Sequence, residues 1–276
     1  MPETKDSASA ETSATPQGFG TFKGVYIPSI LTILGVVLYL RLGWVVGHAG
    51  VLGAILIITL ASSITLFTGL SISATASNMR VGGGGAYFMV SRSFGIEAGA
   101  AIGLPLYLAQ ATGVAFYLVG FAESLQTFLP EVPTPILGIA SLVVVSSLAF
   151  FSANLALKSQ VLIFLIVAGS LVSLAMGNPL PASAAEGLSE VPSVPFWVVF
   201  AVFFPAVTGI EAGVSMSGNL KNPGRSLPLG TLGAVLSGYA VYVGIAFLLW
   251  QFAPEWVLRG NPMVMTEIAA LPSFIY

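Results

Sequence analysis

Residues 203–213 read FFPAVTGIEAG and lie at the end of a long, uncharged apolar run. A proline, two glycines and the carboxylate of Glu211 stand where a membrane-spanning helix is normally most regular and most apolar. Proline removes a backbone N–H donor, and glycine relaxes the limits on backbone dihedrals. The stretch therefore predicts a helix that is interrupted inside the membrane.

The composition is that of a membrane protein. Of the 276 residues, 56% are hydrophobic and 7% are charged, against about 25% charged in soluble domains. A net charge of −2 does not indicate binding to nucleic acid. The chain has no cysteine, so neither a disulfide framework nor a thiolate zinc site is available. No nucleophile and base pair is evident around the single histidine, His48, so we do not expect an enzyme.

Long uncharged runs predict seven membrane-spanning helices, because about 20 apolar residues are enough to cross a bilayer. Continuous runs without strict alternation favour helices over a barrel. The predicted spans are 25–47, 52–77, 96–123, 134–153, 159–177, 194–219 and 229–252. Residues 1–22 are rich in Ser, Ala, Thr and Glu, which predicts a disordered tail and no cleaved signal peptide.

The basic residues predict the orientation of these spans. Seven of the nine Lys and Arg residues fall on one side of the predicted membrane: Lys5, Lys23, Arg80, Arg92, Lys158, Lys221 and Arg225. The positive-inside rule makes this side cytoplasmic. We therefore expect a multi-pass protein of the cell inner (plasma) membrane with a cytoplasmic N-terminus.

The first span contains a second candidate interruption. Residues 27–44 read IPSILTILGVVLYLRLGW, with Pro28 near the start and Gly35 near the middle. An ordinary kinked helix also explains such residues, since glycine and proline are common in membrane spans. Paired breaks in corresponding helices of two repeats instead indicate a binding site at the membrane midplane. A broken helix presents amide N–H groups to an anion and free carbonyls to Na⁺ or K⁺.

The segment between the second and third spans is rich in glycine. Residues 79–95 read MRVGGGGAYFMVSRSFG, but the Lys-Ser or Lys-Thr of a phosphate-binding loop does not follow. We therefore expect a close-packed cytoplasmic turn and not a nucleotide site.

Four blocks together resemble the cation-chloride cotransporters, specifically their prokaryotic relatives. They are FGTFKGVYIPSILTILGVVLYLRLGWVVGHAG, RVGGGGAYFMVSRSFG, VAFYLVGFAES and FFPAVTGIEAGVSMSGNLKNPGRSLPLGT. The resemblance covers nearly everything after residue 18. It implies an all-α membrane protein with a LeuT-like inverted-repeat transporter core of the amino acid-polyamine-organocation superfamily. It also implies electroneutral symport of chloride with potassium, sodium or both by alternating access.

The same resemblance implies a domain organisation. About seven spans are present of an expected ten to twelve, and the end, TEIAALPSFIY, resembles the approach to the eighth helix, so we expect a C-terminally truncated chain. Residues 1–22 would be a cytoplasmic tail, 23–178 the first five-helix repeat and 179–276 the start of the second. The partners would be inorganic ions and the bilayer, with no cofactor and with homodimerisation a property of the full-length protein.

The resemblance places ion sites at the two breaks. The potassium ligands would be Thr32, Ile33, Tyr117, Pro205 and Thr208. The chloride ligands would be backbone amides of Gly35, Val36 and Val37 and of Gly209, Ile210 and Glu211. A partial sodium site would take carbonyls from Leu31 and Leu34. Related sodium-potassium members have Asn where this chain has Thr32, so a hydroxyl replaces a side-chain carbonyl.

An outer gate is implied by two charged residues. Arg41 lies 18 residues after Lys23, about 27 Å along a helix, and Glu123 closes the third span on the same face. In the family such residues pair across the extracellular vestibule. Both charges could instead simply mark span ends. We favour the gate, because ionisable groups within spans usually face a cavity and a partner.

Glu211 departs from the cotransporter pattern, which has an apolar residue at this position. Three explanations are open: the acid carries its proton because burial disfavours a charge, it points away and bonds within the protein, or it serves another substrate. The third explanation matches a second resemblance, since GIEAGVSMSGNLKNPGRSLP is also similar to amino acid permeases. The alternative function is therefore an amino acid or amine permease coupled to protons or sodium.

Overall fold

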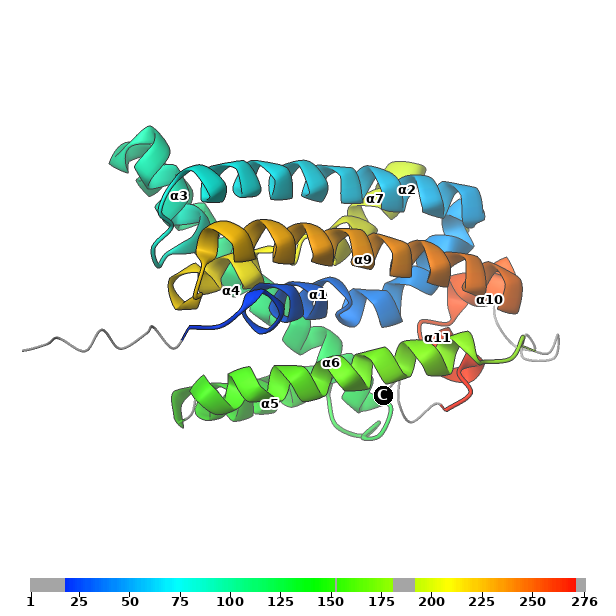
Figure 1. The fold of residues 1–276 in the computed structure, drawn as a ribbon. Helices are drawn as coiled ribbons and strands as arrows, with labels where there is room; N and C mark the ends of the chain where they lie inside the picture. Colours follow the sequence, from blue (N-terminus) through cyan, green and yellow to red (C-terminus); the bar gives the residue numbers. More distant parts are fainter. Residues whose placement is uncertain (1–17, 152, 181–191, 272–276) are drawn as a thin grey trace, which may run out of the picture.

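The structure is a computed structural model that describes residues 18–151, 153–180 and 192–271, and these ranges are almost entirely helical (Figure 1). Most of the tail predicted over residues 1–22 lies outside the described residues. The described part of the chain contains one isolated parallel bridge, between Phe19 and Leu220. An all-α fold, as predicted, follows from the need of a chain in lipid to satisfy its backbone locally.

The first predicted span is broken. A π-helical turn, η1 (Phe22–Tyr26), leads into α1 (Ile27–Ile33), and α2 (Val36–Asn78) follows after two residues. The backbone leaves the helical conformation at Leu34 (φ −87°, ψ 31°) and Gly35 (φ −80°, ψ −159°). Pro28 lies in the first turn of α1, where its missing N–H matters little. Gly35 and not Pro28 therefore marks the break.

The first and second predicted spans are joined without a loop. Helix α2 contains one non-helical residue, Gly50, at φ 68° and ψ 169°. A positive φ is readily adopted by glycine, and the chain reverses at this end of the molecule (Figure 1). The predicted spans 25–47 and 52–77 thus run in opposite directions and meet at a single residue.

The middle of the chain forms four helices. They are α3 (Gly85–Phe94), α4 (Ile96–Gln126), α5 (Thr134–Phe151) and α6 (Ala153–Ala175). The sequence prediction that Lys158 lies between the spans 134–153 and 159–177 is wrong, because Lys158 lies inside α6. The stretch from Ala153 to Lys158 is rich in alanine and leucine, which are strong helix formers, and a single Lys does not end such a helix.

The second half begins with the other broken span. Helix α7 (Phe196–Phe203) tightens into a 3₁₀ turn, η3 (Phe204–Val207), and the chain continues through one α-turn, α8 (Glu211–Val214), and a second 3₁₀ turn, η4 (Ser215–Asn219). The regular helix α9 (Pro223–Phe252) follows, and then the short helices α10 (Glu255–Gly260) and α11 (Val264–Ile268). The predicted interruption near Pro205 and Gly209 is confirmed.

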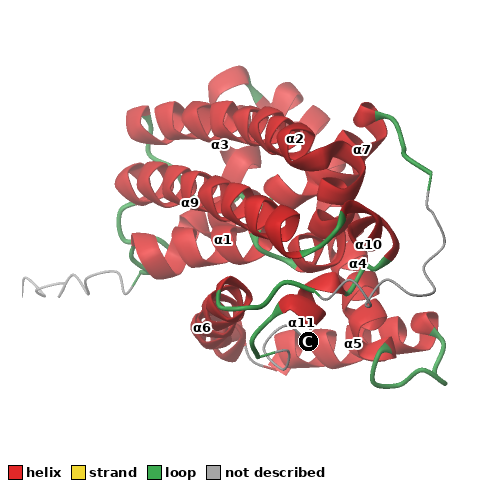
Figure 2. Cartoon of the chain, turned by 90° about the vertical axis from the view of Figure 1, so that its right-hand side faces the viewer, coloured by secondary structure: helices red, strands yellow, loops and turns green. Residues whose placement is uncertain are grey.

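Two long helices organise the packing. Helices α2 and α9 lie side by side, α1 runs beside α9, α6 packs against α1 and α5 packs against α4 (Figures 1 and 2). The core between these helices includes the fully buried side chains Leu38, Leu42, Ile57, Phe203 and Tyr242. The segment α1 and the broken sixth span are therefore packed against α9 and α2, and α2 itself begins with the second half of the broken first span.

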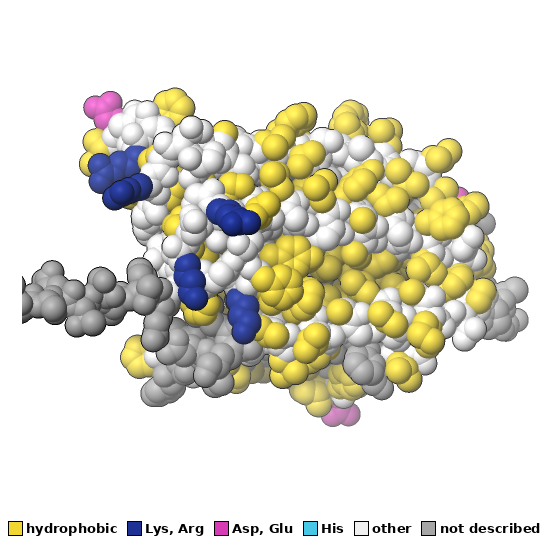
Figure 3. Space-filling model, in the orientation of Figure 1, with side chains coloured by type: hydrophobic (Ala, Val, Ile, Leu, Met, Phe, Trp, Pro, Cys, Tyr) yellow, Lys and Arg dark blue, Asp and Glu magenta, His cyan; other side chains and the backbone are white. Residues whose placement is uncertain are grey.

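The apolar surface fits a bilayer. By length and composition, the described residues contain four segments that could cross a membrane: Phe22–Asn78, Ile96–Gln126, Phe196–Asn219 and Pro223–Phe252. Shorter apolar helices cover Thr134–Phe150 and Ser159–Ala175. Each of the seven predicted ranges falls on one of these segments. Hydrophobic side chains cover the middle of the molecule, and the Lys and Arg side chains visible on this face gather at one end (Figure 3).

The glycine-rich segment is a close-packed turn, as expected. Gly84 and Gly85 adopt positive φ angles of 115° and 55°. The hydroxyl of Ser217 donates to the carbonyl of Gly82 (2.8 Å) and accepts from the amide of Gly85 (3.2 Å). The turn is thereby fixed against the end of the sixth span.

Candidate functional site

The break in the first span leaves peptide groups of both polarities without helical partners. The N–H groups of Gly35, Val36 and Val37 have no hydrogen-bond acceptor among the described residues. The carbonyls of Leu31 and Leu34 likewise accept no bond from the part of the chain that the structure describes. The amides form the N-terminus of α2, which carries partial positive charge. One short segment can therefore face an anion and a cation.

The break in the sixth span supplies a second set of peptide groups without helical hydrogen-bond partners. In the 3₁₀ turn η3 the amide of Thr208 donates to the carbonyl of Pro205 (3.3 Å). The next two amides, of Gly209 and Ile210, have no acceptor within the described ranges. Glu211 begins α8, where a first-turn amide has no intrahelical partner. The three residues expected from sequence to bind an anion thus lie in the break itself.

The two breaks touch each other. The hydroxyl of Thr32 lies 2.6 Å from the carbonyl of Gly209 and is also within reach of two carbonyls of its own helix. The hydroxyl of Ser29 donates to the carbonyl of Ile210 (3.3 Å). A Cβ atom on Gly209 would collide with the side chain of Thr32. Residues 177 positions apart are therefore in direct contact, and glycine permits this approach.

Two tyrosines cover carbonyls at the end of α1. Tyr117 of α4 lies with its hydroxyl 3.4 Å from the carbonyl of Thr32 and its ring against Gly35. Tyr242 of α9 is fully buried, and its hydroxyl donates to the carbonyl of Ile33 at 2.7 Å. The ring of Tyr242 packs edge-on against Phe203, with centroids 5.2 Å apart. Each tyrosine thus replaces a hydrogen bond that the broken helix lacks.

Tyr242 was not expected from the sequence. A tyrosine in the middle of an apolar span was the available signal, since a buried phenol normally finds a hydrogen-bond partner. Its partner, a carbonyl 209 residues away, could not be read from the chain.

The other expected cation ligands lie in the second break. Pro205 and Thr208 have exposed side chains, and the hydroxyl of Thr208 donates back to the carbonyl of Pro205 (2.9 Å). No contact that the structure describes joins either side chain to Tyr117. The structure therefore brings Thr32, Ile33 and Tyr117 together. Pro205 and Thr208 come shortly before Gly209 in the sequence, and the carbonyl of Gly209 contacts Thr32.

The carboxylate of Glu211 has no internal partner within the described residues. No ion pair and no hydrogen bond to it is formed there, although its backbone carbonyl accepts from Ser215 (2.7 Å). The side chain is half-buried. Of the three explanations for this acid, an internal bond finds no support among these residues.

The expected outer pair lies above the first break. Arg41 and Glu123 form an ion pair of 3.3 Å, and both side chains are 39% exposed. Beneath them a cavity of about 40 Å³ is bounded by Val36, Val37, Phe116 and Gly120. This volume is large enough to admit water but not a bulky organic ligand. The charged pair is thus connected to the amides of α2 by a narrow, mostly apolar cavity.

The chemistry of this site is that of main-chain groups. No group of three or more His, Cys, Asp or Glu side chains that could hold a metal ion occurs in the described part of the chain. Paired broken helices that meet at their breaks are a feature of secondary transporters, in which peptide groups replace the hydration shells of small ions. The fold and site therefore define a membrane transporter core.

The comparisons agree with this class. The family described as amino acid permease matches residues 24–255, so the chain belongs to the amino acid permease family. It is 38% identical over 265 residues to solute carrier family 12 member 3 of Mus musculus, over 86% of this chain and 26% of that protein. It is 40% identical over 253 residues to solute carrier family 12 member 2 of Squalus acanthias, over 83% and 21%. Solute carrier family 12 member 1 of Mus musculus is 37% identical over 254 residues, 83% and 23%.

These similarities confirm the expected resemblance to the cation-chloride cotransporters. The chain spans about a quarter of the length of the curated relatives it matches. The matched region contains both breaks and Tyr117.

We predict that Gly209→Ala destabilises the protein by about 1–3 kcal/mol, because its Cβ would force Thr32 and Ile33 away from the second break. Thermal unfolding in detergent measures this change. Gly244→Ala is the matched control: Gly244 lies inside α9 with nothing within 4 Å of the added Cβ, so this variant should be neutral or slightly stabilised. Equal unfolding temperatures for the two variants would contradict the close contact of the breaks.

Proposed function

We propose that this protein is a secondary active transporter that moves chloride together with potassium, sodium or both, with no net charge moved. The observation that carries the proposal is the contact between the two breaks, where free amides and free carbonyls lie within a few residues of one another. Amides suit an anion and carbonyls suit an alkali cation. A site with both can couple the movement of one to the other.

Chloride would bind at the amides. The first set, Gly35 to Val37, lies at the N-terminus of α2 below the Arg41–Glu123 pair. The second set, Gly209 to Glu211, lies on the other broken span. Backbone donors explain why apolar side chains such as Val36 and Ile210 are compatible with an anion site. An ionised Glu211 would repel chloride, so we infer that the acid is neutral during transport or does not contact the ion.

Potassium would bind at the carbonyls. Its ligands would be the carbonyls of Thr32 and Ile33, the hydroxyl of Tyr117, and oxygens of Pro205 and Thr208 from the second break. Hard cations take oxygen ligands of this kind. In the structure the Ile33 carbonyl already accepts a bond from Tyr242, which leaves one lone pair for an ion. Sodium would draw on the carbonyls of Leu31 and Leu34 and on ligands from further helices.

Alternating access would use the charged pair as its outer gate. Breaking the Arg41–Glu123 contact would open the narrow cavity toward the first break. The assignment of residues 23–178 and 179–276 to two inverted repeats belongs to this proposal, as do a cytoplasmic N-terminus and an inner (plasma) membrane location. The packing of α2, which carries the second span, against α9, the seventh span, is consistent with such a paired arrangement.

The amino acid permease alternative is less supported. The relatives compared above belong to solute carrier family 12. The 3.4 Å contact between the Tyr117 hydroxyl and the Thr32 carbonyl supports a role for this tyrosine at a cation site. An amine or proton site would depend on the carboxylate of Glu211, which has no internal partner among the described residues.

We predict that proteoliposomes containing the protein take up rubidium tracer only when chloride is present. Replacing chloride by gluconate should lower the initial rate at least about tenfold, since each cation must move with an anion. An imposed membrane voltage should leave the rate unchanged, because no net charge moves. Protein-free liposomes provide the control. Equal uptake in gluconate would contradict the proposal, and chloride-independent amino acid uptake would favour the permease.

We predict that Tyr117→Phe raises the KM for rubidium about three- to tenfold, as expected from the loss of one oxygen ligand worth about 0.5–1.5 kcal/mol. The KM for chloride should change less. Tyr107→Phe removes the same hydroxyl from a position on α4 that is 70% exposed and should leave both values unchanged. An unaltered rubidium titration in Tyr117→Phe would remove this tyrosine from the site.

A further inference from the structure

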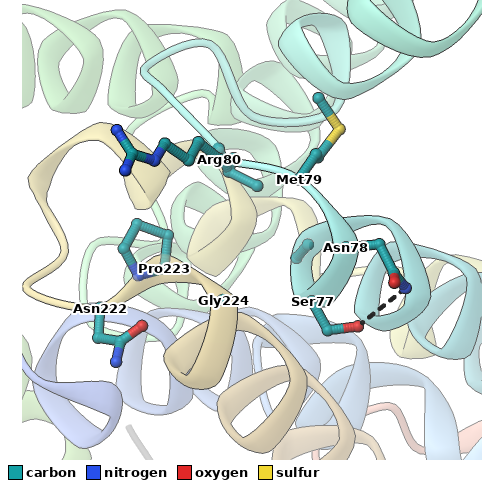
Figure 4. A pocket seen from close by; sticks show the side chains of 9 residues that line it. Ser77, Asn78, Met79, Arg80, Asn222, Pro223 and Gly224 are labelled. Atoms are coloured by element: carbon teal, nitrogen blue, oxygen red, sulfur yellow. Dashed lines mark hydrogen bonds between the residues drawn. The ribbon is translucent and has the colours of Figure 1, made fainter.

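A pocket lined by both polar and apolar groups lies at the opposite end of the bundle from the Arg41–Glu123 pair, where α2 ends and α9 begins. It has a volume of about 540 Å³ and is lined by residues 76–81 and by Asn222, Pro223 and Gly224. Figure 4 shows Arg80 and Met79 on one side of this pocket and Asn222 and Pro223 on the other. The volume lies in the range of pockets that hold small organic ligands. Neither ion site makes use of this pocket.

The surroundings of the pocket are strongly basic. We use the term basic end for the end of the bundle that carries Lys23, Arg80, Arg92, Lys221 and Arg225. None of these five residues forms an ion pair with another described residue. The nearby acid is Glu97, at the start of α4. Figure 3 shows the basic side chains gathered where α2 ends and α9 begins. This end of the molecule therefore attracts anions.

The polar groups of the pocket are free to bind a ligand. Neither the guanidinium of Arg80 nor the side-chain amide of Asn222 has a hydrogen-bond partner in the described ranges. Asn78 donates back to the carbonyl of Ala74 (2.8 Å) and so leaves its own carbonyl oxygen unused. Among the described residues, no Asp or Glu lines the pocket. The guanidinium of Arg80 and the side-chain NH₂ of Asn222 can both donate to a phosphate, which Arg binds through two parallel hydrogen bonds, whereas the free oxygen of Asn78 is an acceptor and does not contribute.

We propose that this pocket binds the phosphate head group of an anionic phospholipid. The pocket lies at the ends of two neighbouring apolar helices, which is the depth of lipid head groups. Basic pockets between membrane helices are established sites for such head groups. Val81 and Met79 beside Arg80 give the pocket an apolar edge that can contact the glycerol backbone. The proposal is independent of which ions the protein transports.

The test is a binding titration on the purified full chain in neutral detergent, with the unfolding temperature as the readout. Short-chain phosphatidylglycerol should stabilise the chain, whereas short-chain phosphatidylcholine and inorganic phosphate should not at the same concentrations. Arg80→Gln should weaken phosphatidylglycerol binding about fivefold, the effect of one basic residue near a charged lipid surface. Arg80→Lys should weaken phosphatidylglycerol binding less than Arg80→Gln does, because the charge is kept. Some weakening should remain, because Lys cannot form the two parallel hydrogen bonds.

Arg92→Gln is the matched control. Arg92 carries the same charge at the basic end but lies over the ring of Phe88, 5.5 Å from its centroid, and does not line the pocket. Its substitution should leave phosphatidylglycerol binding within about twofold of the unmodified chain. An equal loss of phosphatidylglycerol binding in Arg80→Gln and Arg92→Gln would overturn the proposed pocket site. It would indicate instead a general attraction of the anionic lipid to the basic end. Equal stabilisation by inorganic phosphate, or by phosphatidylcholine, would overturn the assignment to an anionic lipid.

Discussion

The structure depends on one constraint, which is that a peptide group inside a bilayer must find a partner within the protein or bind a ligand. An unsatisfied group in hydrocarbon costs several kcal/mol. Two interruptions at Gly35 and near Gly209 would each be costly if they faced lipid. The protein meets this cost by placing the interruptions against each other, where Thr32 bonds the carbonyl of Gly209. The groups still unpaired are the ones available to ions.

The polar groups at the breaks divide into fixed and available members. Tyr242 donates to the carbonyl of Ile33 at 2.7 Å from a fully buried position, an ordinary distance for an O–H···O hydrogen bond. Tyr117 lies farther from its carbonyl, at 3.4 Å, on a helix that faces the outer cavity. The two tyrosines thus differ in burial and in the length of their hydrogen bonds, since Tyr242 is fully buried and Tyr117 is partly exposed. Helices α2 and α9 both pack against the broken sixth span, and α9 also packs against α1.

Much of this arrangement could be predicted from the sequence, because its signals are local. Apolar runs indicated the helices, and Gly35, Pro205 and Gly209 indicated the breaks, since backbone chemistry alone weakens a helix there. The gap between the predicted spans 25–47 and 52–77 contains the turn at Gly50, but the helical conformation of Lys158 was missed, because a charged residue does not by itself mark the end of a helix. Tyr242 was missed for another reason: its role depends on a contact across the whole chain. Ion specificity likewise depends on contacts between residues that are far apart in the sequence.

Hydrogen exchange at the two breaks tests the central claim most directly. If both spans are interrupted and their free amides bind chloride, the peptides containing residues 35–37 and 209–211 should exchange faster than the neighbouring helical peptides. Adding chloride, but not gluconate, should slow exchange in both peptides together. Exchange at both breaks as slow as in the flanking helices, and unchanged by chloride, would contradict the account.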